Sequence, residues 1–189
     1  MRPALVRFRH LRRGGLKRAV KFMNLLDLPF LGRVRRNHGL EHATIHVLIQ
    51  RNPALSLVGR SDWGGYYIYG HVETQELEAA ARQALARLQA GESELALHPR
   101  CGTMLATTGV LSGMAAFFAL GVGRSRSRFR WASLPETLLA ATVAAVIAQP
   151  LGFLLQQYVT TSGEVGDLHV ARIYKQRGGA LPVHRIETR

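Results

Sequence analysis

Two long stretches without any formal charge constrain this chain more than any other feature. The first runs from Cys101 to Gly123 and the second from Thr137 to Gly163. Each is long enough to cross a hydrocarbon core, which takes roughly 20 apolar residues. Both are rich in the small residues that let membrane helices approach closely, as in the pair Gly109 and Gly113. A pair of buried core helices is the soluble alternative, but the rest of the chain could hardly cover both. We therefore predict a two-helix transmembrane hairpin over residues 101–163.

Composition excludes two other classes of protein. The chain has 189 residues, of which 47 % are apolar, so it is not a disordered tail, and its single cysteine excludes a disulfide scaffold. Lys and Arg number 25 against 12 Asp and Glu, and most of this excess lies in residues 1–36. Apolar residues are interleaved there, so this segment is predicted to be a basic amphipathic arm on an anionic membrane surface. Nucleic acid is a less favoured partner, because no aromatic stacking pattern accompanies the arginines.

The remaining residues predict a small folded unit of class α+β. Residues 37–50 look helical, residues 55–72 alternate like two short strands around a turn, and Thr74 to Ala90 forms the clearest helix of the chain. Residues 94–102 indicate a third strand that leads to the membrane. The expected architecture is therefore a helix-strand-strand-helix-strand domain over 37–100, followed by the hairpin and by a polar C-terminal tail over 164–189.

The most informative short motif is H-G-L-E-H, which contains His38, Glu41 and His42. Positions i and i+4 of a helix lie on one face about 5–6 Å apart, so the two imidazoles can hold one metal ion. A zinc ion there would lower the pKa of a bound water, and the carboxylate of Glu41 would accept its proton as general base. The alternative interpretation is a polar helix face in which histidines cap the helix or bond to Glu41.

A zinc site needs a third protein ligand, and two regions offer one. Glu164 and His169 follow the second apolar stretch, and a hairpin returns them to the side of the membrane on which the motif lies. The alternative for these two residues is a polar cap on the helix end. His98 and Cys101, just before the first stretch, are the other candidates. Cys101 could instead be a nucleophile activated by a nearby histidine, or a small buried residue.

Three segments together resemble a known family. The strings N-H-G-L-E-H-A-T-I-H, G-R-S-D-W-G-G-Y-Y-I-Y-G and L-A-L-H-P-R-C-G-T, ahead of an apolar hairpin, resemble an uncharacterised family of bacterial membrane proteins over roughly residues 35–170. That resemblance implies an architecture but no activity. The motif from His38 to His42 is also similar to the H-x-x-E-H motif of inverzincin proteases, in which the third ligand is a downstream glutamate, and this similarity favours Glu164. The chain differs from inverzincins in having a hairpin and no large protease domain.

These observations lead to two functional hypotheses. The first is a membrane-anchored zinc-dependent hydrolase, such as a peptidase, in the bacterial inner membrane. The second is a non-enzymatic subunit or assembly factor, whose hairpin packs against other subunits of a membrane complex or a second copy of the chain. Arginines in the connector between the apolar stretches argue for placing that connector in the cytoplasm, but the richer N-terminal segment and the lack of an export signal favour a cytoplasmic soluble domain.

Overall fold

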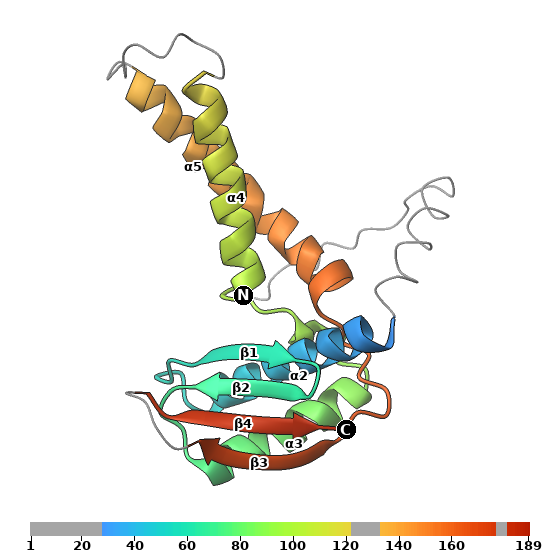
Figure 1. Cartoon of the computed structure of the whole chain (residues 1–189). Coiled ribbons are helices and arrows are strands. Elements are labelled where there is room, and N and C mark those ends of the chain that lie inside the picture. The colour runs from blue at the N-terminus through green and yellow to red at the C-terminus, as the bar shows by residue number, and fades with distance from the viewer. Residues whose placement is uncertain (1–27, 122–132, 177–180) are drawn as a thin grey trace, which may run out of the picture.

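The computed structural model describes residues 28–121, 133–176 and 181–189. It consists of a four-stranded sheet, two helices that cover one face of that sheet, and a pair of long helices that project away from it (Figure 1). The expected α+β class with a helical hairpin is therefore confirmed. The predicted basic arm lies in part outside the described residues, which begin at Leu28.

The sheet is antiparallel throughout and joins segments from both ends of the chain. Its strands are β1 (Val58–Asp62), β2 (Gly65–Tyr69), β3 (Val170–Gln176) and β4 (Val183–Thr188), in the order β1-β2-β4-β3. β4 pairs with β2 so that Tyr66 lies opposite Ile186. The residues expected to form a polar tail thus supply half of the sheet. Their polar appearance arises because β3 and β4 carry charged residues at many of their positions, such as Arg172 and Arg185.

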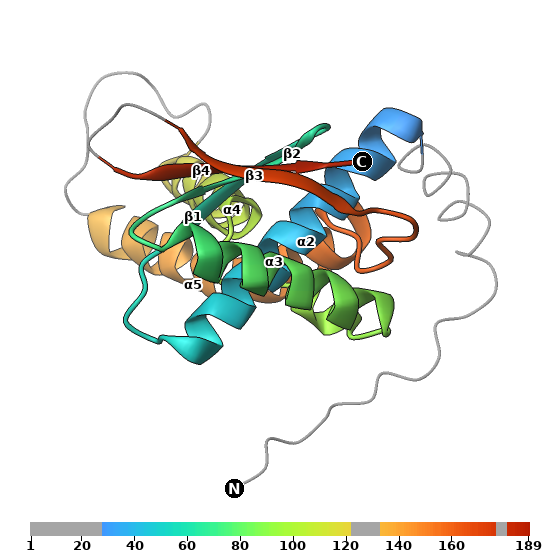
Figure 2. The ribbon, with the colours of Figure 1, turned by 90° about the horizontal axis from the view of Figure 1, so that it is seen from below.

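Two helices cover one face of the sheet, and within the described residues the other face carries no helix (Figure 2). These are α2 (Pro29–Arg51) and α3 (Thr74–Gln89). The core between the layers consists of apolar side chains from all these elements, among them Leu40, Leu48, Tyr66, Ile68, Leu77, Ala81 and Ile186, all fully buried. α2 thus has neighbours on most of its circumference, since ten of its residues from Asn37 to Leu48 are buried.

α2 begins earlier than the helix predicted from residue 37. Pro29 occupies its first turn, where the missing N–H costs nothing. Asn37 is fully buried, and its amide donates to the carbonyl oxygens of Asp62 and Trp63 at 2.8 and 3.2 Å. Its own oxygen accepts from the Thr188 hydroxyl at 2.7 Å. Asn37 therefore ties α2 to the β1–β2 turn and to the end of β4.

The predicted third strand over residues 94–102 was wrong. This segment forms a short 3₁₀ helix, η1 (Ser93–Ala96), and then an irregular connection to the hairpin. Pro99 lacks the N–H that a strand interior needs. The carbonyl oxygens of Ala96 and Leu97 accept hydrogen bonds from histidine rings of α2 and not from a neighbouring strand.

The projecting hairpin consists of α4 (Gly102–Ala119) and α5 (Leu134–Leu155), and a π-helical turn, η3 (Gln156–Thr160), continues α5. Gly152 lies against Met104, and the Ser112 hydroxyl donates to the carbonyl oxygen of Ala141 at 3.1 Å. Both helices are long and apolar enough to cross a membrane. In the most apolar 18 residues of each span, only 6 % is buried in Gly102–Ala119 and 11 % in Leu134–Thr160, so these are not core helices of the sheet unit.

Candidate metal centre

His38 and His42 lie one turn apart on α2, as the motif predicts. Their ring centroids are 4.4 Å apart in an edge-on arrangement. His42 is 1 % exposed and His38 is half-buried. The two imidazoles thus form a compact pair on the face of α2 that the hairpin approaches.

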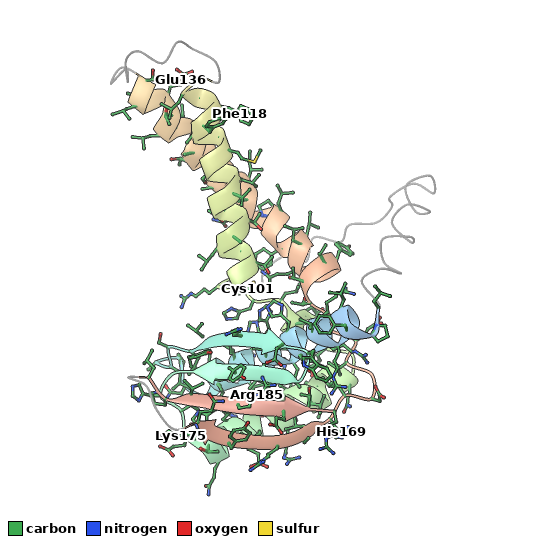
Figure 3. The ribbon with its side chains drawn as sticks, viewed as in Figure 1. Cys101, Phe118, Glu136, His169, Lys175 and Arg185 are labelled. Atoms are coloured by element: carbon green, nitrogen blue, oxygen red, sulfur yellow. The ribbon has the colours of Figure 1, made fainter. Side chains whose placement is uncertain are left out.

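The third member of the cluster is Cys101, the residue that precedes the first turn of α4. The ligand atoms of His38, His42 and Cys101 all lie within 4.8 Å of one another. Cys101 is buried, and Figure 3 shows it at the end of α4 nearest to the sheet unit. The structure therefore brings together two candidate ligands from the folded domain and one from the base of the hairpin.

Main-chain carbonyl groups orient both imidazoles. The Nδ1 atom of His38 lies 2.9 Å from the carbonyl oxygen of Thr160, and that of His42 lies 2.7 Å from the carbonyl oxygen of Ala96. Because a carbonyl oxygen only accepts, Nδ1 carries the hydrogen in each ring and Nε2 keeps its lone pair. This arrangement is typical of histidine ligands, whose second nitrogen is held by an outer partner.

The Nε2 atom of His42 is the most informative single atom of the cluster. It is buried and has no hydrogen-bond partner within the described part of the chain. A buried polar atom without a partner costs about 1–3 kcal/mol, so native structures rarely keep one without a reason. A metal ion between the two rings and the thiol would satisfy it.

Burial keeps these histidines neutral at physiological pH. It lowers the pKa of His42 to about 3, with a smaller contribution from the neighbouring His38 ring. Burial also lowers the pKa of His38, although the hydrogen bond to Thr160 opposes that shift. Neutral imidazole is the form that binds a metal.

His98 lies beside the cluster, but it does not belong to the three ligand groups. Its ring centroid is 5.6 Å from that of His42 and 5.0 Å from that of His46. Its Nδ1 atom accepts from the main-chain N–H of Arg100 at 3.2 Å. Burial, followed by the neighbouring charges of His46 and Arg100, lowers its pKa to about 4.

Glu41 points toward β1. Its carboxylate accepts a short hydrogen bond from the Ser61 hydroxyl, and a Cβ atom on Gly59 would overlap it. The side chain is buried, which raises its pKa to about 7 against the opposing effect of Ser61. Glu41 is thus a buried neighbour of the cluster in sequence, and it is not one of its three ligand groups.

The candidates that follow the second apolar stretch lie at the surface. Glu164 is exposed and lines a surface pocket of about 360 Å³ together with Arg35 and Tyr158. His169 is exposed as well, and its Nδ1 atom lies 3.4 Å from the carbonyl oxygen of Asp167. Neither is part of the group of three ligand residues.

A residue that sequence analysis missed lies next to His98. Gln156, in η3, is fully buried, and its Oε1 atom accepts from the main-chain N–H of His98 at 2.9 Å. Its Nε2 atom is buried and has no partner among the described residues. The only signal for Gln156 in the sequence was a polar side chain inside a largely apolar stretch.

Comparisons with known proteins place the chain in a family of unknown function. Residues 33–173 match the family model described as a domain of unknown function, DUF6391. An uncharacterized protein of Picosynechococcus is 35 % identical over 138 residues, which cover 68 % of this chain and 66 % of that relative. No solved structure matches the chain. The expectation of an uncharacterised family over roughly residues 35–170 is confirmed.

Proposed function

The chain belongs to the DUF6391 family, and we propose that it is a membrane-anchored, zinc-dependent hydrolase whose metal is held by His38, His42 and Cys101. The proposal rests on one observation above the others, the buried Nε2 atom of His42 that lacks a partner. This atom belongs to a ring whose other nitrogen is already held by the Ala96 carbonyl group. The structure supports Cys101 as third ligand in place of Glu164.

The chemistry of the three donors favours zinc. Two imidazoles and a thiolate match a catalytic zinc site, which keeps a fourth position for water or substrate. Cys101 is the N-cap residue of α4, so its side chain lies at the N-terminal end of that helix. A zinc ion in such a site lowers the pKa of a bound water toward ~7.

Glu41 is the proposed general base. It directly precedes His42 in sequence and lies three residues after His38 on the same helix. Ser61 holds one of its oxygens, and Gly59 leaves the space that the carboxylate occupies. Both contacts come from β1, which supports a role of that strand in orienting Glu41.

The apolar hairpin supports a membrane location. Large apolar side chains are exposed along both helices, including Leu105, Phe117, Phe118, Leu138 and Val146. If the hairpin spans the bilayer, Cys101 lies at the first turn of the first span and the cluster lies at the bilayer surface. A peptide or a lipid-linked ester at that surface is the proposed substrate, and the inner membrane with a cytoplasmic domain is the proposed location.

Metal analysis of the purified full-length protein tests the ligand set. We expect about one zinc ion per chain, because the proposed site is a single centre. The double variant His38→Ala, His42→Ala and the variant Cys101→Ser should lose it. The matched controls His169→Ala and Glu164→Gln remove the surface candidates and should keep it. Zinc retained by the double variant would contradict the site.

Replacing zinc by cobalt provides a second readout that does not need a substrate. The wild type should show a thiolate-to-cobalt absorption band, and Cys101→Ser should lose this band. Glu41→Gln should keep both the metal and the band but lose hydrolysis of p-nitrophenyl esters or of a casein-derived peptide. Unchanged hydrolysis in Glu41→Gln would reject its role as general base.

One observation favours the second candidate function, a subunit or assembly factor. Gly109 and Gly113 are exposed on α4, and a Cβ at either position would have no atom within 4 Å. The small-residue pair therefore lies away from α5, where another membrane helix can pack. Native mass measurement after gentle detergent extraction separates the cases. A monomer that binds zinc would contradict this alternative, whereas a larger complex without zinc would favour it.

A further inference from the structure

Large apolar side chains are exposed at one corner of the sheet unit. Leu28, Phe30 and Leu31 lie at the start of α2, and Trp63 lies in the β1–β2 turn. Phe30 is 61 % exposed and Trp63 is 60 % exposed. The guanidinium of Arg33 lies 5.8 Å from the Trp63 ring centroid, so the start of α2 and the β1–β2 turn are neighbours. We call these residues, with Arg33, Arg35 and Arg36, the α2 corner.

Hydrogen bonds place the α2 corner beside the end of the second apolar helix. Arg35 donates to the carbonyl oxygens of Tyr158 and Thr161 at 3.3 and 3.2 Å. The main-chain N–H of Ser162 donates to the carbonyl oxygen of Arg35 at 3.0 Å. Figure 1 shows the start of α2 directly next to the lower end of α5. A hairpin that spans a bilayer would therefore hold this corner at the bilayer surface.

The positive charge of the α2 corner favours an anionic surface. Arg33, Arg35 and Arg36 lie within the first turns of α2, and its first turn contains no acidic residue. Arg33 also donates to the carbonyl oxygen of Thr188 at 2.7 Å, and Arg36 lies 3.5 Å from the exposed carboxylate of Asp167. A combination of aromatic and aliphatic side chains with arginines is typical of segments that lie in the interface of an anionic bilayer. Basic side chains near such a surface are attracted to its negative potential.

We propose that the α2 corner inserts into the headgroup layer of an anionic leaflet, with Phe30, Leu31 and Trp63 among the acyl chains and the positive charge of the arginines facing the lipid phosphates. The proposal depends on the hairpin part of the proposed function but not on zinc or hydrolysis. It would hold the sheet unit against the membrane, so that the cluster near Cys101 faces the headgroup layer.

Tryptophan fluorescence of the full-length protein in vesicles tests the insertion. The chain has two tryptophans, so Trp131→Phe leaves Trp63 as the single emitter. In phosphatidylglycerol-containing vesicles whose lipids carry bromine near the headgroup, we expect Trp63 to lose most of its emission. The matched control adds Trp63→Phe and Lys175→Trp, which moves the indole to the strand farthest from the hairpin (Figure 3). The Lys175→Trp indole should keep its emission.

The charge requirement has its own readout. In vesicles of brominated phosphatidylcholine alone, or in the variant Arg33→Gln, Arg36→Gln, we expect the quenching of Trp63 to fall. Equal quenching in all lipids and variants would overturn the anionic preference. Equal quenching of the two indole positions would overturn the insertion itself.

An alkaline carbonate extraction distinguishes a failure of this proposal from a failure of the proposed function. Resistance of the protein to alkaline carbonate reports whether the hairpin is inserted. A protein that resists extraction but shows no quenching of Trp63 contradicts only the α2 corner. A protein that carbonate releases contradicts the hairpin, and with it both proposals that need a bilayer.

Discussion

Among single residues, two buried hydroxyl groups form a hydrogen bond whose donor can be assigned by counting their hydrogens. The Thr44 hydroxyl donates to the carbonyl oxygen of Leu40 at 2.8 Å, and the Tyr66 hydroxyl lies 2.8 Å from the same Thr44 oxygen. Thr44 has a single hydroxyl hydrogen, so Tyr66 must be the donor in the second bond. Burial raises the pKa of Tyr66, which keeps its hydroxyl protonated.

This assignment predicts unequal costs for two similar substitutions. Tyr66→Phe removes a donor and leaves Thr44 bonded to Leu40, so it should lower the free energy of unfolding by about 0.5–1.5 kcal/mol. Thr44→Val leaves the Tyr66 hydroxyl buried without an acceptor and should cost about 1–3 kcal/mol. Thermal unfolding of the detergent-solubilised chain measures both. A larger cost for Tyr66→Phe would contradict the assignment.

Single glycines also decide what the neighbouring side chains can do. A Cβ on Gly59 would overlap the carboxylate of Glu41. Because the helix interior cannot move away from β1 without disturbing the core, only glycine at this position lets Glu41 stay where Ser61 reaches it. The proposed general base therefore depends on a residue of another element, which no motif around Glu41 contains.

Among the elements, an ion pair joins strands that lie far apart in the sequence. Arg185 in β4 donates to both carboxylate oxygens of Asp62, at the end of β1, at 2.8 and 2.9 Å. The guanidinium also lies 4.4 Å from the Tyr67 ring centroid. Partial burial raises the pKa of Asp62, but the hydrogen bonds from Arg185 and from the main chain of Gly64 outweigh it and lower that pKa below its usual value.

The lowered pKa predicts how stability changes with pH. A carboxyl group whose folded-state pKa lies below its unfolded value contributes stability above the unfolded pKa, here near 3.8, and loses it as the pH falls through the folded value. Asp62→Asn should therefore lower the melting temperature at neutral pH, and its difference from the wild type should shrink below about pH 4.

The control for this pH dependence is Glu78→Gln. Glu78 pairs with Arg82 one turn away on an exposed face of α3, and such pairs contribute little. Its melting temperature should follow that of the wild type across the same range. A constant difference between Asp62→Asn and the wild type down to strongly acid pH would contradict the role of the ion pair.

At the scale of the whole molecule, the hairpin is an insertion in the sequence of one folded unit. β1 and β2 precede it and β3 and β4 follow it, yet all four form one sheet. The chain leaving η3 passes so close to α2 that a Cβ on Gly39 would overlap the carbonyl oxygen of Ser162. This close approach also brings the Thr160 carbonyl group to His38.

The close approach predicts that one added methyl group disturbs the proposed metal centre from a distance. Gly39→Ala should push η3 away from α2 and lower zinc affinity about 10-fold or more, as loss of an outer partner of a histidine ligand does. Competition with a chromophoric chelator measures the affinity. Gly113→Ala, where the added Cβ has open space, should bind zinc like the wild type. Unchanged affinity in Gly39→Ala would contradict the coupling.

Local sequence patterns predicted the helices and strands better than they predicted which elements pack or pair with one another. The helix with His38 and His42, the β1–β2 hairpin and the helix from Thr74 were predicted, because each depends on spacing within a few residues. β3 and β4 were missed, since the many charged residues of these strands conceal their alternation. Residues 94–102 look like a strand by composition, but the sheet has no place for them and their carbonyl groups bond to histidines of α2.

The sequence by itself determined the α+β class, the two apolar helices and the pairing of two imidazoles on one helical face, because helix geometry relates residues four positions apart. Only the tertiary structure decided which residue joins them. The sequence favoured Glu164, with His98, Cys101 and His169 as further candidates, whereas the tertiary structure brings the Cys101 thiol into the group with His38 and His42. That choice depends on contacts between segments far apart in the chain, and no local spacing records them.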